Sequence, residues 1–191
     1  VVLNSDYKRY SGLSNLDFDA GKNLKIGTKM FFQRASQNGV KSQESSGGST
    51  NTGVIAGALI MEPTAGIYNE DGSYTISSIG DPKDNPFAVA TEYVNESVSD
   101  QFQGNGYVDW TILKGLVFKT TFGANIVNSR TGTYSPTSLN SGANVDGDAD
   151  INAYKRTSLL SENYLSYNKT FTGSHKINLM AGYSYQSYRD E

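Results

Sequence analysis

A few short clusters in this chain of 191 residues have the residue types and spacing that a binding site would need. The best of them is Asp146-Gly147-Asp148-Ala149-Asp150, whose alternating carboxylates match the opening of a calcium-binding loop. The match then fails, because Ile151 stands where an EF-hand loop needs glycine and Thr157 where it needs a bidentate glutamate. We interpret this cluster as a solvated loop and expect no metal site there.

The other clusters are incomplete in the same way. Gly104-Asn105-Gly106 lacks the third glycine of a dinucleotide-binding loop. His175 is the single histidine, and without a cysteine or a second histidine it cannot form a metal site of the usual kind. The pattern contains no nucleophile with a neighbouring base and no paired catalytic carboxylates. We therefore predict no catalytic residues and no cofactor, and expect that the chain is not an enzyme.

Composition excludes some partners and leaves the fold open. The net charge is −3, which argues against nucleic acid because such binding usually needs a basic surface. The mean hydropathy of −0.47 resembles that of a soluble domain, but polar lumen residues and long loops give a transmembrane barrel the same average. The longest apolar run, Val54–Met61, is far shorter than the roughly 18 residues of a membrane helix.

The strongest pattern is a period of two between Phe102 and Ile126, interrupted by a tight turn at Leu113–Gly115. Successive side chains of a strand point to opposite faces of the sheet. A stretch with apolar residues on even positions and polar residues on odd positions therefore predicts a half-buried strand. Limbs of roughly 10 residues also match tilted strands that cross a bilayer. The apolar or small residues fall on even positions, among them Phe102, Val108, Trp110, Ile112, Leu116, Phe118, Phe122 and Ile126.

The same alternation predicts three hairpins. The oily face takes even positions in the first two hairpins and odd positions in the third, where Leu165, Tyr167 and Leu179 carry it. The first two turns, Gly21–Asn23 and Leu113–Gly115, would place Asp19 opposite Lys25, Asp109 opposite Lys119, and Trp110 opposite Phe118. The third turn is expected at Phe171–Ser174. The six strands are expected at about residues 7–20, 24–37, 98–112, 116–128, 158–170 and 175–188.

Two long connections, residues 35–98 and 129–156, separate the hairpins. In the first we expect a short helix from Val54 to Met61, stopped by Pro63, and a small hairpin turning at Asp71-Gly72. Tyr68, Asp71 and Tyr74 on this small hairpin are the candidate substrate contacts, because aromatic rings and carboxylates suit recognition of sugars or peptides. The alternative is that they only pack the loop.

The charged residues test the barrel interpretation independently. A Lys or Arg at the lipid midplane costs about 2–4 kcal/mol, so charges should avoid the oily face. Within the alternating stretches at residues 10–20, 24–34, 102–112, 116–126, 158–169 and 175–185 they do, apart from Arg34 and Lys169. These two lie at strand ends, from which a long side chain can reach the interface. The sequence therefore predicts an all-β fold, an antiparallel up-and-down transmembrane β-barrel segment of about six strands with two long extracellular loops. The charges on the opposite face are Asp17, Asp19, Lys25, Lys29, Asp109, Lys119, Glu162 and Lys176.

Several stretches also resemble the SusC/RagA-type TonB-dependent outer-membrane transporters. They are Asn15–Phe18, Leu24–Gly27, Asn85–Phe87, Ile112–Phe118, Glu162–Phe171 and Ala181–Gln186, and together they span nearly the whole chain. The resemblance implies a plugged barrel in the bacterial outer membrane, in contact with its lipid. Such a barrel imports glycan or peptide fragments with a SusD-like lipoprotein lid and energy from TonB.

Residues 1–191 contain neither a plug domain nor a TonB box and begin without methionine, so we expect part of a barrel from a longer protein. A second class of function remains open. The strands of a β-rich secreted or surface module for binding or adhesion would also alternate polar and apolar residues. In such a module one face of each sheet packs against the core and the other faces solvent.

Overall fold

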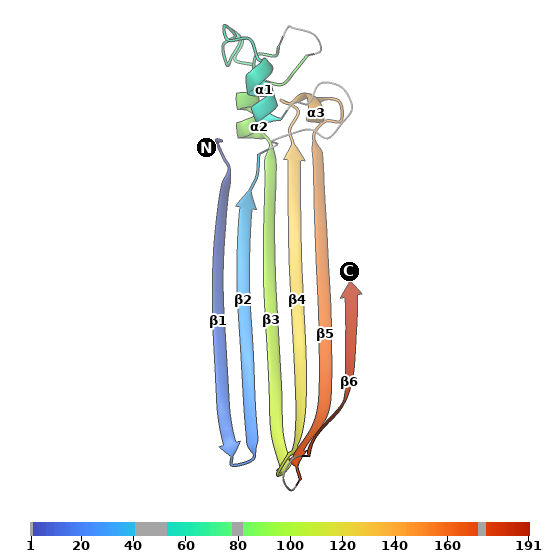
Figure 1. The fold of residues 1–191 in the computed structure, drawn as a ribbon. Helices are drawn as coiled ribbons and strands as arrows, with labels where there is room; N and C mark the ends of the chain where they lie inside the picture. The colour runs from blue at the N-terminus through green and yellow to red at the C-terminus, as the bar shows by residue number, and fades with distance from the viewer. Residues whose placement is uncertain (1, 41–52, 78–81, 172–174) are drawn as a thin grey trace. The chain divides into compact units, whose positions relative to one another are not determined.

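A computed structural model describes residues 2–40, 53–77, 82–171 and 175–191. Six antiparallel strands form one sheet and follow one another across it in sequence order (Figure 1). This is the up-and-down arrangement that the alternation predicts. The strands are β1 (Asp6–Gly21), β2 (Leu24–Asn38), β3 (Val94–Leu113), β4 (Leu116–Ser135), β5 (Asp148–Thr170) and β6 (Lys176–Asp190), and the helices are α1 (Val54–Ile60), α2 (Pro86–Glu92) and α3 (Asn140–Ala143).

The long connections are shorter than the sequence suggests. β4 continues to Ser135 and β5 starts at Asp148, so the second connection covers residues 136–147 and not 129–156. The first covers residues 39–93 and not 35–98. The end of β4 beyond Ser129 does not alternate, but its backbone still pairs, and backbone pairing needs no particular side chain. The start of β5 does alternate, with Ala149, Ile151 and Ala153 on odd positions, and we had assigned this stretch to a polar loop.

The chain divides into two compact units, which we call the sheet unit and the loop unit. The sheet unit comprises Arg9–Arg34, Ser99–Ser129 and Tyr154–Glu191. The loop unit comprises Val1–Lys8, Ala35–Val98 and Arg130–Ala153. Each has its own kind of interior, so they are described separately.

The sheet unit has no buried apolar core among its described residues. The buried apolar side chains are Ala88, Val89, Ala90 and Leu139, and all four belong to the loop unit. On the predicted oily face the side chains stay largely exposed, for example Phe18 at 61%, Phe122 at 62% and Leu179 at 63%. A sheet with such a face needs an apolar environment that the chain itself does not supply.

The pairing of β5 with β6 confirms that the odd positions of these two strands share a face. Tyr167 lies opposite Leu179, and Leu165 lies opposite Ala181. Thr170 pairs with Lys176, whereas a turn at Phe171–Ser174 would have paired it with His175. The connection is therefore one residue longer than predicted, and residues 172–174 of it lie outside the described part of the chain.

The first two hairpins bring together the oppositely charged residues that the predicted register pairs. Lys25 Nζ lies 3.8 Å from Asp19 Oδ1, and Lys119 Nζ lies 3.4 Å from Asp109 Oδ1. The strands run further into both turns than predicted, so the connections are Lys22-Asn23 and Lys114-Gly115 and each is one residue shorter than expected. Gly115 has φ of +90°, a backbone conformation that favours glycine. The pairing of Trp110 with Phe118 stays a prediction.

The loop unit packs short helices around a small core. α1 appears where predicted, and Gly57 on it lets Pro86 of α2 approach, since a Cβ there would lie 3.3 Å from Pro86 Cβ. Val89 and Leu139 are 1% and 2% exposed and share one cluster with Ala88. No described helix of this chain has the length and apolar character needed to cross a membrane.

The helix α2 was not predicted from the sequence, although its start carries a recognisable signal. The side-chain oxygen of Asn85 accepts a hydrogen bond from the Phe87 N–H at 2.9 Å, and Pro86 occupies the first turn. Asparagine is a preferred N-cap residue and proline is favoured at the first helical position. The dipeptide Asn85-Pro86 therefore starts a helix, where we had expected it only to lead the chain into the next strand.

Candidate functional site

The small hairpin that carries the three candidate substrate contacts forms as predicted. Tyr68 and Tyr74 pair across it, and the Asn69 N–H donates to the Ser73 carbonyl at 2.8 Å. The chain reverses at Asp71-Gly72, where Gly72 has φ of +84°. Only glycine adopts such a backbone conformation without strain, so the reversal point is set by the sequence.

Tyr68 and Tyr74 belong to an aromatic cluster with Phe87 of α2. The two tyrosine rings stack with centroids 5.2 Å apart, and Phe87 meets Tyr68 edge-on at 6.4 Å. The Tyr74 hydroxyl donates to Glu92 Oε1 at 2.9 Å, which fixes that ring against α2. Tyr68 remains 54% exposed, so one aromatic surface of the cluster faces outward.

Asp71 lies at the tip of the hairpin and stabilises the turn itself. Its Oδ1 accepts hydrogen bonds from the N–H and the hydroxyl of Ser73, at 2.9 and 2.6 Å. These bonds from Ser73 hold the pKa of the exposed Asp71 carboxyl below its ordinary value, since they favour the ionised form. The structure therefore brings the two tyrosines together and places the Asp71 carboxylate on its own turn.

A groove of about 460 Å³ runs beside the small hairpin, and we call it the hairpin groove. Asn85 supports one wall, because its Nδ2 donates to Thr75 Oγ1 at 2.8 Å and to the Ile67 carbonyl at 3.3 Å. Both long connections contribute to the groove. Its lining residues are Asn69, Gly72, Ser73, Tyr74, Thr75, Ile76, Asp84, Asn85, Ala88, Ser138 and Asn140.

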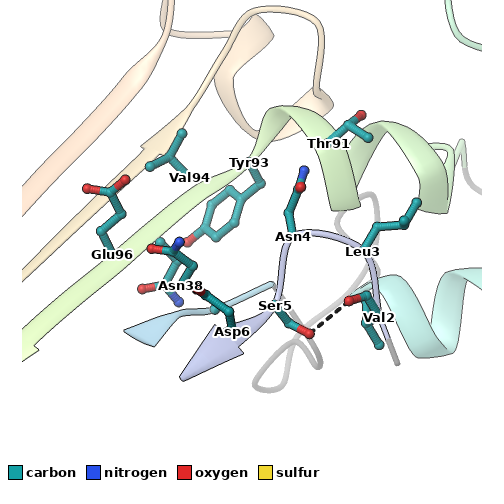
Figure 2. A pocket seen from close by; sticks show the side chains of 12 residues that line it. Val2, Leu3, Asn4, Ser5, Asp6, Asn38, Thr91, Tyr93, Val94 and Glu96 are labelled. Carbon is teal, nitrogen blue, oxygen red and sulfur yellow. Dashed lines mark hydrogen bonds between the residues drawn. The ribbon is translucent and has the colours of Figure 1, made fainter. Parts of the chain in front are cut away.

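A second hollow, of about 720 Å³, lies between the N-terminal segment, the end of β2 and the start of β3 (Figure 2). Asn4 adopts a left-handed backbone with φ of +56°, and its side chain donates to the Ala90 carbonyl at 3.1 Å. The Ser5 hydroxyl donates to the Val2 carbonyl at 2.8 Å, drawn as the dashed line in Figure 2. These contacts hold residues 2–5 against the end of α2 and so shape one side of the hollow.

Both hollows are lined by groups that bind and orient, without a set of groups that would react. Asn is the commonest lining residue of both hollows, and the carboxylate of Asp6 in the second hollow is paired with Lys8 Nζ at 3.0 Å. No group of three or more His, Cys, Asp or Glu residues with metal-binding geometry occurs among the described residues. The arrangement suits reversible contact with a polar ligand.

Sequence reasoning missed the residues that complete the hairpin groove. Asp84 Oδ1 accepts a hydrogen bond from the Asn140 N–H at 2.9 Å, across 56 positions of sequence. Leu139 beside it is buried against α2. Nothing in the periodicity of either connection signals this contact, because both segments are irregular. A readable hint is Leu139, an apolar residue with polar neighbours on both sides.

Comparison of the whole sequence finds TonB-dependent receptors of the bacterium Formosa agariphila. The chain is 44% identical to TonB-dependent receptor P3 over 191 residues, which are 100% of the chain and 19% of that receptor. It is 29% identical to TonB-dependent receptor P39 over 98% of the chain and 17% of that receptor. No family model matches the chain.

Comparison of the fold finds solved structures of the RagAB peptide importer. For its 'closed-closed' state the TM-score is 0.72 with 23% identity, covering 96% of this chain and 20% of the solved one. For its 'open-open' state the TM-score is also 0.72, over 97% of this chain. The chain thus spans about a fifth of the length of the relatives that it matches.

These comparisons agree with the architecture. A single up-and-down sheet whose apolar face is exposed along all its strands defines a β-barrel segment. The chain is therefore similar in sequence to a segment of the TonB-dependent receptors and similar in fold to a segment of the RagAB importer, as its resemblance to that family suggested.

Proposed function

We propose that this chain forms part of an outer-membrane importer of oligomeric nutrients. The observation that carries the proposal is the exposed apolar face of the sheet unit, whose described residues contain no buried apolar side chain. Lipid is the environment that satisfies such a face, because it removes the apolar area from water while the polar face turns to the lumen. The 44% identity to a TonB-dependent receptor supports the same conclusion.

In this proposal the two long connections lie on the extracellular side. Short turns join one set of strand ends, and residues 39–93 and 136–147 join the opposite set. Outer-membrane barrels have this asymmetry, with short periplasmic turns and long outer loops. The full-length protein would draw energy from TonB and work with a SusD-like lipoprotein lid above these loops.

The imported nutrient is a glycan or peptide fragment that meets the barrel at Tyr68, Asp71 and Tyr74. The exposed ring of Tyr68, backed by Tyr74 and Phe87, offers a rigid apolar surface at little cost in side-chain entropy. The Asp71 carboxylate is ionised and exposed at the tip of the same hairpin, where it can accept hydrogen bonds from hydroxyl or amide groups.

The proposal is tested by deleting Gly66–Thr75 from the full-length transporter. We expect uptake of the oligomeric nutrient to fall strongly while the barrel still assembles, because the deletion lies wholly within one connection. Uptake is measured with oligosaccharide and peptide mixtures as separate nutrients, and assembly by the shift of a heat-resistant band on a gel. Tyr68→Ala should reduce uptake more than Tyr134→Ala, which truncates another exposed tyrosine of the loop unit. Unchanged uptake after the deletion would contradict the importer role of this loop.

A further inference from the structure

The apolar face of the sheet unit ends in a row of charged side chains, on the side of the long connections. On β3 the even positions from Ile112 to Phe102 carry apolar side chains or glycine, and the next even position is Asp100. On β2 the same face changes from Phe32 to Arg34. A tilted strand of about ten residues rises about 25 Å along the barrel axis, which is the height of the apolar band of outer-membrane barrels. The row therefore lies where the strands reach the edge of the hydrocarbon.

Contacts between neighbouring strands set the members of the row side by side. Arg34 Nε lies 3.8 Å from Asp100 Oδ1, so β2 and β3 are both charged at this level. The strand pairing that brings Asp109 to Lys119, continued along β3 and β4, places Asn128 beside Asp100. The row thus crosses β4 with a polar amide.

The row continues across β5 and β6. The Asn168 N–H donates to the Gly115 carbonyl at 2.7 Å, and this register places Lys155 beside Asn128. Lys155 on β5 and Glu191 directly after β6 donate their backbone N–H groups to each other's carbonyls at 2.9 Å. Both residues fall on odd positions, which form the apolar face of the third hairpin.

The charged row, as we call Arg34, Asp100, Lys155, Arg189 and Glu191, has more cations than carboxylates. Glu191 serves two cations, because Lys155 Nζ lies 3.2 Å from its Oε2 and Arg189 Nε lies 2.7 Å from its Oε1. The 3.8 Å between Arg34 and Asp100 is longer than a hydrogen bond. The side chains of Arg34, Lys155 and Arg189 are 59%, 50% and 78% exposed, and ion pairs between such exposed groups are weak. The row therefore has cationic groups that can bind a further anion.

The position of the row favours an anion that is joined to acyl chains. Lys and Arg lay their aliphatic stems along apolar surface and extend their charges to the head-group level of a membrane. Basic clusters there attract anionic lipid head groups, and a guanidinium binds phosphate through two parallel hydrogen bonds. The acyl chains of such a lipid also cover Phe32 and Phe102, which are 51% and 38% exposed next to the row. A free anion would leave these rings uncovered.

We propose that the charged row binds the phosphate groups of an outer-leaflet lipid, with Arg34, Lys155 and Arg189 as the groups that contact them. The proposal rests on the outer-membrane placement in the proposed function and adds a lipid-binding surface to it. Because the cations stand on different strands, a lipid that carries two phosphates is bound more tightly than the same lipid without them.

The test uses the purified full-length transporter in detergent and two probes, diphosphoryl lipid A and the same lipid with both phosphates removed. Native mass spectrometry measures the affinity for each probe. One variant combines Arg34→Gln, Lys155→Gln and Arg189→Gln. We expect it to bind diphosphoryl lipid A at least about tenfold more weakly than the natural sequence does.

The matched control combines Arg9→Gln, Lys29→Gln and Lys176→Gln, which removes the same charge from exposed positions on the polar face of the sheet unit. We expect this control to bind diphosphoryl lipid A as the natural sequence does. A heat-resistant band on a gel shows that each variant has assembled.

A second measurement needs no variant, and it decides the matter if a variant fails to assemble. The natural sequence should bind the dephosphorylated lipid at least about tenfold more weakly than diphosphoryl lipid A, and inorganic phosphate at constant ionic strength should not displace the lipid. Equal binding of the two lipids, equal binding by the two variants, or displacement by inorganic phosphate would overturn the inference. Nutrient uptake by the natural sequence is measured separately, so the importer proposal stands or fails on its own result.

Discussion

Tyr107 on β3 reaches across β2 to Asp17 on β1, and its hydroxyl donates to Asp17 Oδ1 at 2.7 Å. Gly27 on β2 lies beneath this contact. A Cβ at Gly27 would overlap with Tyr107 Cε1 and Asp17 Oδ1, so only glycine leaves room for the ring. The Tyr107 side chain thus links three strands on the polar face of the sheet. Its ring also covers Gly27, an arrangement of aromatic residue and glycine that recurs in β-sheets.

Gly27→Ala should therefore displace Tyr107 and weaken the sheet. We expect a loss of about 1–3 kcal/mol in the free energy of unfolding, the usual effect of forcing extra atoms into an occupied space. Urea unfolding of the full-length protein in lipid measures it. Gly12→Ala is the matched control, because a Cβ at Gly12 on β1 meets no atom within 4 Å. Equal stability of the two variants would show that Tyr107 moves away at no cost.

The second prediction concerns the apolar face of the sheet and compares substitutions at two adjacent residues of β6. Leu179 is on the expected lipid face and Asn178 on the opposite one, since Tyr167 and Asn168 of β5 are their partners. Leu179→Arg should destabilise the barrel in a bilayer by about 2–4 kcal/mol, the cost of a guanidinium at lipid depth. Asn178→Arg should cost little. The comparison is made by unfolding in lipid vesicles, and similar effects of the two substitutions would argue against a lipid-facing sheet.

The parity of side chains predicted the sheet because every residue of a strand is constrained by the face on which it lies. Leu165 and Leu179 could be assigned to one face from sequence alone, and the β5–β6 pairing confirms that assignment. The same signal vanishes at the end of β4, beyond Ser129, which remains a strand without alternation. That end could not be predicted, because a strand that only pairs its backbone accepts almost any side chain. The start of β5 does alternate, with Ala149 and Ile151 on odd positions, but its carboxylates led us to interpret it as a loop.

The candidate site also has one part that could be predicted from the sequence and one part that could not. The turn at Asp71-Gly72 was predictable because its conformation depends on local residues, and Gly72 indeed has a positive φ. The groove wall formed by Asp84 and Asn140 was not predictable, since it joins two irregular segments by one long-range hydrogen bond. Whether Tyr68 and Tyr74 contact a substrate stays a prediction, although their stacking shows that they act as one surface.

A third prediction concerns pH and the outer end of β6, beyond the expected membrane span. Arg156 Nε and one of its terminal nitrogens lie 2.7 and 2.8 Å from the two carboxylate oxygens of Asp190. The hydrogen bonds from Arg156 lower the pKa of Asp190 from its ordinary value. A depressed folded pKa means that the stabilisation is complete above the unfolded pKa, about 3.9, and is lost as the pH falls through the folded pKa.

Hydrogen exchange checks this prediction when the natural sequence and Asp190→Asn are compared at the same pH. Near pH 6 the amides of Lys155 and Glu191, which bond each other's carbonyls, should exchange faster in the variant. The difference should shrink as the pH falls from about 3.9 through the lower folded pKa of Asp190, below which the natural carboxylate is also neutral. A difference that persists unchanged at pH 2 would assign the effect to packing and not to charge.

A fourth prediction concerns residues 1–191 expressed alone. β1 and β6 are each paired on one side only, and the apolar face between them is uncovered. Open edges and a large apolar face promote association in water. We expect aggregates in buffer and dispersion only in detergent, as measured by light scattering. A monodisperse monomer that melts cooperatively without detergent would favour a secreted binding module.

The fifth prediction fixes the orientation of the barrel. If residues 39–93 and 136–147 are extracellular, protease added to intact cells should cut within them and spare the turn at Lys114-Gly115. Cysteine labelling gives the same information without relying on protease access, and residues 1–191 contribute no cysteine of their own. Ser138→Cys, on an exposed residue of the second connection, should react with an impermeant maleimide on whole cells, whereas Lys114→Cys should react only after the outer membrane is opened.

The two labelling sites separate the possible outcomes because they lie in connections at opposite strand ends. β4 leads from the Lys114-Gly115 turn to the second connection, so one site cannot change side without the other. If only Lys114→Cys is labelled on intact cells, the orientation of the barrel is the reverse of the one proposed. Tyr68 and the hairpin groove would then lie in the periplasm. A nutrient arriving from outside would then not meet them first, and the importer proposal would lose its capture site. Labelling of both would mean that neither strand end is shielded, which a chain spanning the outer membrane does not allow.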